Sequence, residues 1–257
     1  MIKLKGEAIV KDDILVSVIT VTYNCEKTIQ RTIDSVVAQQ YSNIEYIIVD
    51  GVSSDNTLNI IKASKKKYPG IIKYVSEKDK GLYDAMNKGI KMANGEIIGI
   101  INGDDYYTDF AVQSAVALFE KESIDIVYSD LIYCRDGKVD TEHPLKADHR
   151  RLVERMSVNH PTCFVKKSVY DKYGIFDTQF RIAADYEIMA RFYANNCIFK
   201  KSDKVLAVME AGGLSNNNWK TVNEKYLIHR KYFSRISAEL YRVRNVLLYV
   251  YRVIKRK

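Results

Sequence analysis

The 257-residue chain has only four cysteines, and none of them is spaced for a structural role. They lie far apart, with no CxxC spacing and no nearby histidine pair: Cys25, Cys134, Cys163 and Cys197. Zinc sites and disulfide frameworks need such clusters, so the pattern argues against both. Isolated cysteines fit a reducing compartment, and we expect a cytoplasmic protein.

Long apolar stretches are also missing. The chain contains no run of about 18 apolar residues, the length that a membrane-spanning helix requires. Its first residues lack the apolar core of a signal peptide. We therefore expect neither a membrane span nor a secretion signal. No internal repeat or low-complexity linker is present, and the composition is that of a globular protein.

The net charge of +8 is concentrated near the C-terminus. Residues 217–257 carry eleven Lys or Arg against two Glu, a charge of +9, which leaves −1 for the preceding 216 residues. Apolar residues recur there every three or four positions, which predicts a basic amphipathic helix. Such a helix suits an anionic membrane surface. The alternatives are a packing helix, a dimer contact or nucleic-acid binding, and we expect no nucleic-acid partner because no recognised binding module accompanies the charge.

The most informative stretch is residues 95–105. Residues 96–101 are almost continuously apolar, as in a strand buried on both faces, and the run ends in Asn102-Gly103-Asp104-Asp105. An unpaired carboxylate is costly in a dry core, so both aspartates must lie where the chain returns to solvent. Adjacent carboxylates suit a hard cation or hydroxyl donors. The alternative is an Asx turn and a cap for a helix that begins near Thr108.

Strand and helix patterns alternate through the first half of the chain. β-Branched and apolar runs predict strands, and three- to four-residue spacing predicts helices. The predicted strands are 16–22, 44–49, 71–75, 96–101 and 124–128; the predicted helices are 28–39, one that follows Asp55, 82–93 and 111–121. This order predicts an α/β fold with a mostly parallel central sheet. Parallel strands point the same way, so the loops 50–55, 77–81 and 102–105 should share one rim.

Mixed structure is expected after residue 130. Asp136-Gly137 favours a hairpin over 131–139. Strands are predicted at 162–165 and 205–209, with a helix over 185–195 between them.

Seven short motifs follow one another along the chain. They are SVITVTYN (17–24), DGVSSD (50–55), SEKDKGLYDAMNKG (76–89), NGDD (102–105), HP (160–161), AADY (183–186) and GGLS (212–215). Their order and spacing resemble those of family 2 glycosyltransferases with the GT-A fold, nucleotide-sugar-dependent inverting enzymes of bacterial polysaccharide assembly. Val52 departs from the family pattern, which more often has a small residue there.

The resemblance implies a domain organisation and a set of donor contacts. Residues 1–216 would form the GT-A domain, with a nucleotide-binding half (about 14–130) and an acceptor-binding half (131–216), followed by the helical tail 217–257. The resemblance implies a UDP-sugar as the nucleotide-sugar. It would contact seven residues: Thr22, Tyr23 and Asn24 near the base, Asp50 accepting from a uracil N–H, Asp79 and Lys80 near the nucleotide, and Asp104 at the ribose. Lysine would supply a point charge for phosphate. For Asp50, an Asx turn is the alternative, and the two roles are compatible.

A metal ion and a general base complete the implied site. Asp105 would bind a divalent cation, Mg²⁺ or Mn²⁺, that bridges the diphosphate and offsets charge on the leaving group. Asp185 would deprotonate the acceptor hydroxyl, with Glu187 as the second choice and a helix N-cap as the alternative role for Asp185. His160 would either help to hold the acceptor or the diphosphate, or hydrogen-bond a loop carbonyl ahead of Pro161. The second, structural role is favoured.

Two further expectations concern glycines and histidines. Residues 212–215 would form a loop over the phosphates or an ordinary turn. His143, His149 and His229 have no ligand partners at useful spacing and are expected at the surface.

These observations predict an inverting glycosyltransferase that transfers a sugar to a saccharide or lipid-linked saccharide, in capsule, lipopolysaccharide or other polysaccharide biosynthesis. The basic tail would hold it peripherally on the inner face of the cell membrane. One rival is a sugar nucleotidyltransferase, which would carry a glycine-rich basic loop where this chain has residues 23–27, Tyr-Asn-Cys-Glu-Lys. The other is a membrane-associated scaffold without catalysis.

Overall fold

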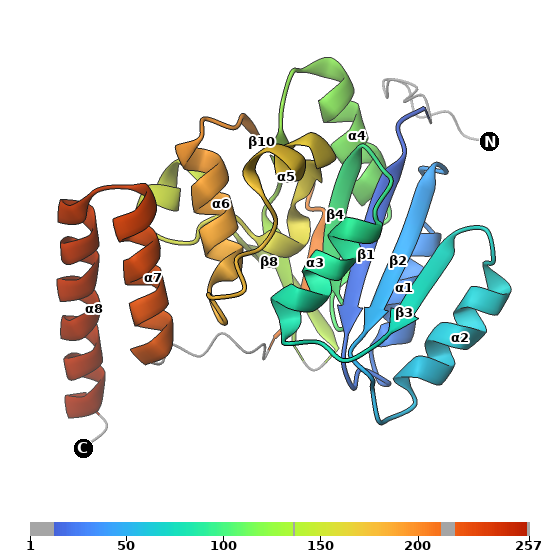
Figure 1. Cartoon of the computed structure of the whole chain (residues 1–257), viewed down its shortest axis with the longest axis horizontal. Helices are drawn as coiled ribbons and strands as arrows, with labels where there is room; N and C mark the ends of the chain where they lie inside the picture. The colour runs from blue at the N-terminus through green and yellow to red at the C-terminus, as the bar shows by residue number, and fades with distance from the viewer. Residues whose placement is uncertain (1–12, 136, 212–218, 256–257) are drawn as a thin grey trace.

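The computed structural model describes residues 13–135, 137–211 and 219–255, with side chains up to Tyr249. A seven-stranded sheet crosses the molecule in the order β10-β6-β9-β4-β1-β2-β3 (Figure 1). Its strands are β1 (Val16–Thr22), β2 (Ile44–Asp50), β3 (Ile72–Ser76), β4 (Ile97–Asn102), β6 (Ile126–Tyr128), β9 (Phe164–Lys166) and β10 (Phe199–Lys201). All neighbouring pairs are parallel except those of β9, which runs antiparallel to both β4 and β6.

Helices cover both faces of this sheet. Strands β1, β2 and β4 send alternate side chains into two apolar clusters, because successive residues of a strand point to opposite faces. The first cluster includes α3 (Leu82–Met92), α5 (Lys167–Tyr173) and α6 (Ala184–Ala194). The second includes α1 (Ile29–Val37), α2 (Thr57–Lys67) and α4 (Ala111–Lys121). The predicted α/β fold with a mostly parallel sheet is confirmed.

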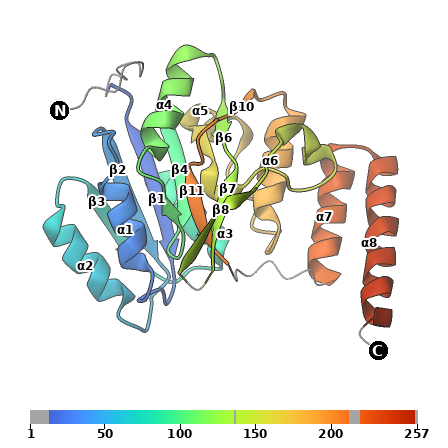
Figure 2. The ribbon, with the colours of Figure 1, turned by 180° about the vertical axis from the view of Figure 1, so that it is seen from behind.

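A smaller sheet packs beside the large one. Its order is β5-β11-β7-β8, formed by β5 (Tyr106–Tyr107), β7 (Leu131–Arg135), β8 (Lys138–Leu145) and β11 (Ala207–Glu210) (Figure 2). Strands β7 and β8 form the predicted hairpin. Two short 3₁₀ segments, η1 (His149–Val153) and η2 (His160–Thr162), follow it. Because η2 contains Pro161, the predicted strand over 162–165 begins later, at Phe164.

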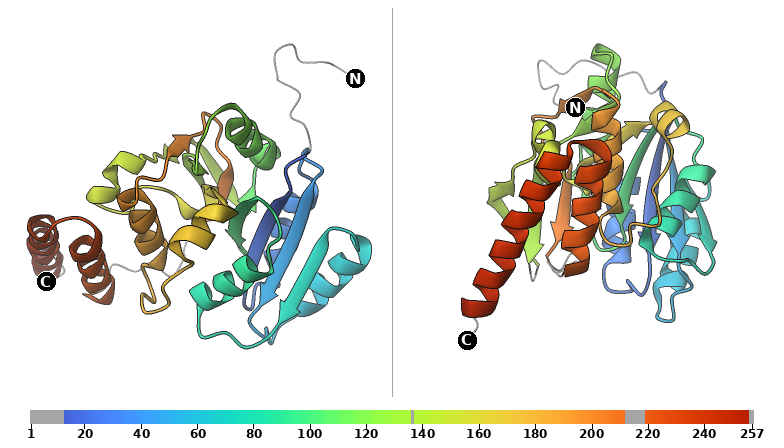
Figure 3. Two further views of the ribbon diagram at one scale, coloured as in Figure 1. Left: turned by 45° about the horizontal axis from the view of Figure 1, so that its top comes forward. Right: turned by 60° about the vertical axis from the view of Figure 1, so that its left-hand side comes forward.

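The C-terminal segment forms two helices where one was expected. Helices α7 (Trp219–Tyr232) and α8 (Arg235–Lys255) form an antiparallel pair beside α6 (Figure 3). Ser234 separates them and caps α8, accepting the Ser237 N–H at 3.0 Å. Ile228 of α7 is fully buried in the cluster that also holds α6.

The surface location predicted for His229 is wrong. Its ring is only 1% exposed, stacks on Tyr241 at 4.4 Å and hydrogen-bonds the Tyr186 hydroxyl at 3.0 Å. His143 is exposed and His149 is half-buried. Within the described ranges, no helix is both long enough and apolar enough to cross a membrane.

Candidate active site

The carboxyl ends of four strands form one rim. In the strand register, Thr22 lies beside Asp50, Asp50 beside Ser76, and Val21 beside Asn102. Side chains at this edge are no longer enclosed by helices, which makes it the usual ligand site of an open parallel sheet. The rim that was predicted from the loops after the strands is therefore present.

Two glycines bring the rim loops into close contact. A Cβ on Gly51 would lie 3.2 Å from Asp79 Oδ2 and 3.4 Å from the Tyr23 ring. A Cβ on Gly103 would lie 2.6 Å from Thr22 Oγ1, closer than real side chains approach. Glycine at 103 is therefore required for the close approach of Thr22, and glycine at 51 lets Tyr23 and Asp79 pack against its backbone. The Tyr23 ring remains 63% exposed and offers a free aromatic face.

Asp50 and Asn24 shape the loop after β2. Asp50 is fully buried and accepts hydrogen bonds from the Ser53 N–H at 3.2 Å and from the Ser53 and Ser76 hydroxyls, each at 2.5 Å. Asn24 accepts the Ser54 N–H at 2.8 Å. Asp50 thus forms the Asx-type turn that was its alternative role.

Lys88, which was not predicted as a site residue, forms an ion pair with Asp79. Lys88 Nζ lies 2.6 Å from Asp79 Oδ1 and 2.9 Å from Glu77 Oε1. Burial opposes the charge of Lys88, but these carboxylates raise its pKa. Lys80 is exposed, and its N–H donates to Asp84 Oδ2 at 3.0 Å. Lys80 and Lys78 are therefore the exposed cations of this loop.

The two aspartates that follow β4 lie in different environments. Asp105 is 1% exposed, and its two oxygens accept the Glu210 N–H at 3.0 Å and the Asn102 amide at 3.2 Å. Burial and the charge of Asp104 raise the pKa of Asp105 to about 7. Asp104 is half-buried, and no other described residue donates a hydrogen bond to its carboxylate. Burial, reinforced by the charge of Glu210, raises the pKa of Asp104 as well.

Arg31 ties this acidic corner to the small sheet. Its guanidinium lies 2.8 Å from Glu210 Oε2, donates to the Asp104 carbonyl at 2.8 Å and stacks on the Tyr106 ring at 4.4 Å. No local sequence pattern predicts this ion pair, because Arg31 and Glu210 are 179 positions apart. The bonds hold Asp104 at the end of β4.

These residues fit a divalent cation that is shared with a phosphate ligand. The Asp104 carboxylate accepts no hydrogen bond from another described residue. Burial is the main cause of the raised pKa of each aspartate, and like charge (Glu210 for Asp104, Asp104 for Asp105) adds to it; a bound cation would offset that charge. In the part of the chain that the structure describes, no group of three or more His, Cys, Asp or Glu side chains could hold a metal ion unaided. Phosphate oxygens would have to complete the coordination, as is usual for Mg²⁺.

Asp185 comes from the second half of the chain and contacts Tyr83, which follows the rim loop 77–81. It lies in the first turn of α6, where its Oδ1 accepts the Tyr186 N–H at 2.8 Å. The Tyr83 hydroxyl, at the start of α3, lies 3.4 Å from the same oxygen and donates to the Ile182 carbonyl at 2.9 Å. Burial raises the pKa of Asp185, while the Tyr186 N–H and the charge of Lys225 oppose the shift. Tyr83 thus joins Asp185 to the loop that carries Asp79.

The other two acceptor-side candidates are enclosed. Glu187 is fully buried between Arg191 at 2.5 Å, Lys231 at 3.3 Å and the Tyr232 hydroxyl, so it is closed to a substrate. His160 is buried with its ring edge against Phe176, and burial lowers the pKa of His160 to about 4. Residues 212–215 lie outside the described residues.

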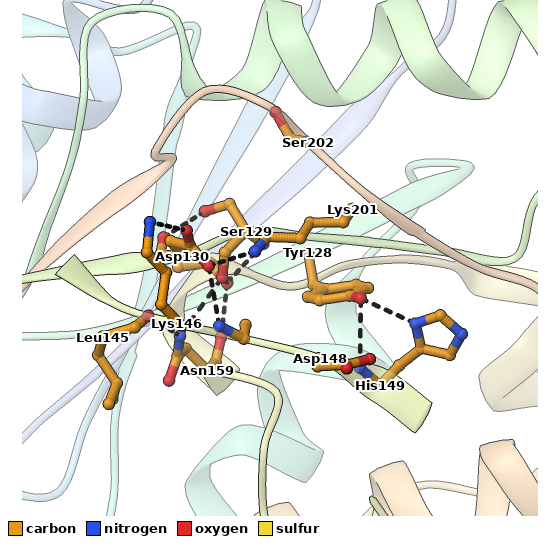
Figure 4. Close-up of polar contacts among 12 residues, drawn as sticks. Tyr128, Ser129, Asp130, Leu145, Lys146, Asp148, His149, Asn159, Lys201 and Ser202 are labelled. Carbon is orange, nitrogen blue, oxygen red and sulfur yellow. Dashed lines mark hydrogen bonds and ion pairs between the residues drawn. The ribbon is translucent and has the colours of Figure 1, made fainter. Parts of the chain in front are cut away.

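A separate basic depression of about 650 Å³ lies beside β6 and β10, lined by cations that include Arg151, Arg155 and Lys200. Figure 4 shows two of its lysines, Lys146 and Lys201, directed at Asp130, with distances of 3.0 and 2.5 Å. It includes none of the predicted site residues. Asp130 already pairs with both of these cations.

Solved structures define the class to which this architecture belongs, the GT-A glycosyltransferase fold. TarS 1–349 from S. aureus, in complex with UDP, matches with a TM-score of 0.67 at 22% identity, over 83% of this chain and 64% of that chain. The mannosyltransferase PcManGT from Pyrobaculum calidifontis, in complex with GDP-Man and Mn²⁺, matches with a TM-score of 0.66 at 18% identity, over 88% and 67%. At these identities the likeness establishes the fold.

The chain belongs to glycosyltransferase family 2, because the profile of Glycosyl transferase family 2 matches residues 17–193. A PGL/p-HBAD biosynthesis glycosyltransferase of Mycobacterium bovis is 27% identical over 223 residues, 83% of this chain and 82% of the relative. The UDP-Glc:alpha-D-GlcNAc-diphosphoundecaprenol beta-1,3-glucosyltransferase WfaP of Escherichia coli is 36% identical over 122 residues, 48% of each chain. The protein is therefore a glycosyltransferase.

Proposed function

We propose that this enzyme is an inverting glycosyltransferase that moves a sugar from a UDP-sugar to a hydroxyl acceptor. One observation supports the proposal most: Tyr83, which follows the rim loop 77–81, lies with its hydroxyl 3.4 Å from Asp185 Oδ1. A donor on the rim would thus have a carboxylate opposite it. The nucleotide complexes of TarS and PcManGT support a nucleotide-bound donor.

The donor would lie along the ends of β1, β2 and β4. Tyr23 and Thr22 would border the base, and Asp50 with Asn24 would shape the loop that meets it. Lys80 would approach a phosphate, and Asp104 the ribose or the cation. Because both oxygens of buried Asp105 already accept protein donors, Asp104 offers the accessible oxygens and Asp105 would support it from beneath.

The bound cation would supply charge compensation for the departing nucleoside diphosphate. The protein's own contribution would be the base. Burial raises the pKa of the half-buried Asp185, which makes its carboxylate a better proton acceptor. A carboxylate on the face opposite the leaving group yields inversion, because the acceptor oxygen then attacks from that side.

The decisive measurement is release of UDP from UDP-glucose, UDP-galactose and UDP-GlcNAc, with and without Mn²⁺. We expect metal-dependent release from at least one donor. Asp185→Asn should lower the rate by ~10²-fold or more with unchanged UDP affinity. Asp104→Asn should weaken Mn²⁺-dependent UDP binding, and more strongly than Asp105→Asn. Pyrophosphate formation from UTP and a sugar phosphate would instead reveal a nucleotidyltransferase, and inertness toward all three UDP-sugars would refute the proposed UDP-sugar donor.

We further propose that the acceptor is a saccharide or lipid-linked saccharide and that α8 rests on an anionic membrane. Four apolar side chains, 55–76% exposed, form one stripe at four- and three-residue spacing: Ile236, Leu240, Val243 and Leu247. Buried Ala238 lies on the opposite side of α8, so this stripe faces away from α7. Arg242 and Arg244 flank it, and their charge favours an anionic surface over a second basic helix. The diphosphoundecaprenol acceptor in the name of WfaP points the same way.

Vesicle co-sedimentation tests this contact. We expect binding to phosphatidylglycerol vesicles and little binding to phosphatidylcholine. Leu240→Glu with Leu247→Glu should abolish binding, whereas Val139→Glu, at another exposed apolar site on β8, should not. Persistent binding of the double variant, or concentration-dependent dimerisation that the variant removes, would overturn the membrane assignment.

A further inference from the structure

The start of α6 lacks a cap of its own. Its N-cap residue is Ala183, whose side chain cannot accept a hydrogen bond, and no side-chain bond from that residue caps the helix. The first N–H groups of a helix need acceptors from elsewhere. This matters here because Asp185 lies only two positions beyond Ala183.

An acceptor on α7 instead holds the three residues that lead into α6. The Glu224 carboxylate accepts three consecutive backbone N–H groups, those of Arg181 at 3.1 Å, Ile182 at 3.0 Å and Ala183 at 2.9 Å. Three bonds to one carboxylate hold this backbone segment more firmly than a single side-chain cap would, since hydrogen bonds to charged groups are the stronger kind. The negative charge also lies at the positive end of the α6 dipole.

The same segment is held from the opposite side. The Ile182 carbonyl accepts the Tyr83 hydroxyl, so residues 181–183 are clamped between α3 and α7. Helix α7 is itself fixed in the core, because Ile228 is fully buried and Lys231 contacts buried Glu187 at 3.3 Å. The position of Glu224 is therefore set by the fold.

We propose that Glu224 is a positioning residue for Asp185: from α7 it fixes the 181–183 backbone so that the Asp185 carboxylate faces the acceptor. This assignment rests on the proposed function, in which Asp185 is the base. It makes α7 a part of the catalytic machinery, although the family profile ends at residue 193. Loss of the three bonds would let the start of α6 move, and a displacement of about 1 Å at a reacting group can cost ~10²-fold in rate.

The test compares Glu224→Ala and Glu224→Gln with Glu239→Gln. Glu239 lies on α8, where it accepts the Tyr226 hydroxyl at 2.7 Å, and it provides the same charge change away from the 181–183 segment. UDP release is measured with the best donor of the panel and Mn²⁺, and the affinity for UDP with Mn²⁺ is measured by calorimetry. We expect kcat to fall ~10²-fold in Glu224→Ala and less in Glu224→Gln, which keeps one acceptor oxygen. UDP affinity should stay within about twofold, and Glu239→Gln should match the wild type.

Two results would overturn the assignment. One is a wild-type kcat in both Glu224 variants while Asp185→Asn is inactive. Asp185 would then still be the base, but it would not depend on Glu224 for its position. The other is a loss of UDP affinity in proportion to kcat, which would indicate general structural damage. If Glu224→Ala does not fold, Glu224→Gln alone decides. A fully active Asp185→Asn would refute the proposed base, and the two failures are thereby distinguished.

Discussion

A buried histidine should make the C-terminal pair of helices sensitive to acid. Burial lowers the pKa of His229 from 6.5 to about 4, although a bond to the Glu154 carbonyl opposes the shift. Its ring contacts Tyr186 of α6 and stacks on Tyr241 of α8, so it lies where three helices meet. A proton on this ring would be buried there, far from solvent.

The sign and size of the effect follow from linkage. The unfolded chain binds a proton at its normal pKa, whereas the folded chain does so only near pH 4; the unfolded state therefore binds more protons between these values, and stability rises with pH. The contribution is complete above pH 6.5 and is lost as pH falls toward 4. Its size is roughly 3 kcal/mol, at about 1.4 kcal/mol per unit.

The assay is urea unfolding at several pH values from 7.5 to 4.5, followed by circular dichroism and by fluorescence of Trp219, the single tryptophan, which contacts Tyr249. His229→Gln should be destabilised at pH 7.5, yet its free energy of unfolding should fall less steeply with acid, by up to roughly 3 kcal/mol over the range. His143→Gln, at an exposed site, should follow the wild type. Parallel curves for the wild type and His229→Gln would refute the reasoning.

Two further predictions concern the sheet. Burial opposes the charge of Glu45, but hydrogen bonds from Ser17, Asn94 and Lys73 lower its pKa to about 2. The stability that Glu45 contributes is therefore present above pH 4.5 and lost as pH falls through 2. Glu45→Gln should cost about 3 kcal/mol of unfolding free energy at pH 7 in urea unfolding, and unchanged acid sensitivity of this variant would contradict the prediction. Gly99→Ala should lower stability by about 1–3 kcal/mol, because its Cβ would lie 2.7 Å from the Phe164 ring and from the Tyr107 hydroxyl oxygen. Gly70→Ala, with no atom within 4 Å, is the control in the same thermal melt, and equal melting temperatures would refute the packing argument.

Local patterns were sufficient for the nucleotide side of the fold. The strand predicted over residues 16–22 has those bounds, and the helix predicted over 82–93 ends one residue earlier, at Met92. These segments have a strong period and clear ends, so neighbours along the chain determine them. The shared rim also followed directly, since it depends only on parallel strands.

Contacts between distant segments were beyond such reasoning. The small sheet joins residues 106–107 to 207–210, and β5 has only two residues, too few to show a period. The ion pair between Glu210 and Arg31 likewise joins segments far apart in the sequence, so no local motif predicts it. The burial of Asp105 beneath Asp104 could not be read from two identical neighbouring letters.

The C-terminal segment shows how composition can mislead. Its charge suggested an appendage, and its apolar stripe suggested one helix. Ser234, which serves as the N-cap of α8, is the local sequence signal for the break. The burial of His229 and the bonds of Glu224 to the 181–183 segment depend on that break, because it folds α8 back along α7.

The antiparallel strand β9 limits where the polypeptide can be truncated. Strand β9 lies between β4 and β6, so one of the two strands that pair with β4 comes from a segment more than sixty residues downstream. A polypeptide truncated before residue 160 would leave β4 with one bare flank, a template for aggregation. Chimeras that splice the first half of this enzyme to a foreign second half should consequently stay soluble only when the replacement brings its own equivalent of β9.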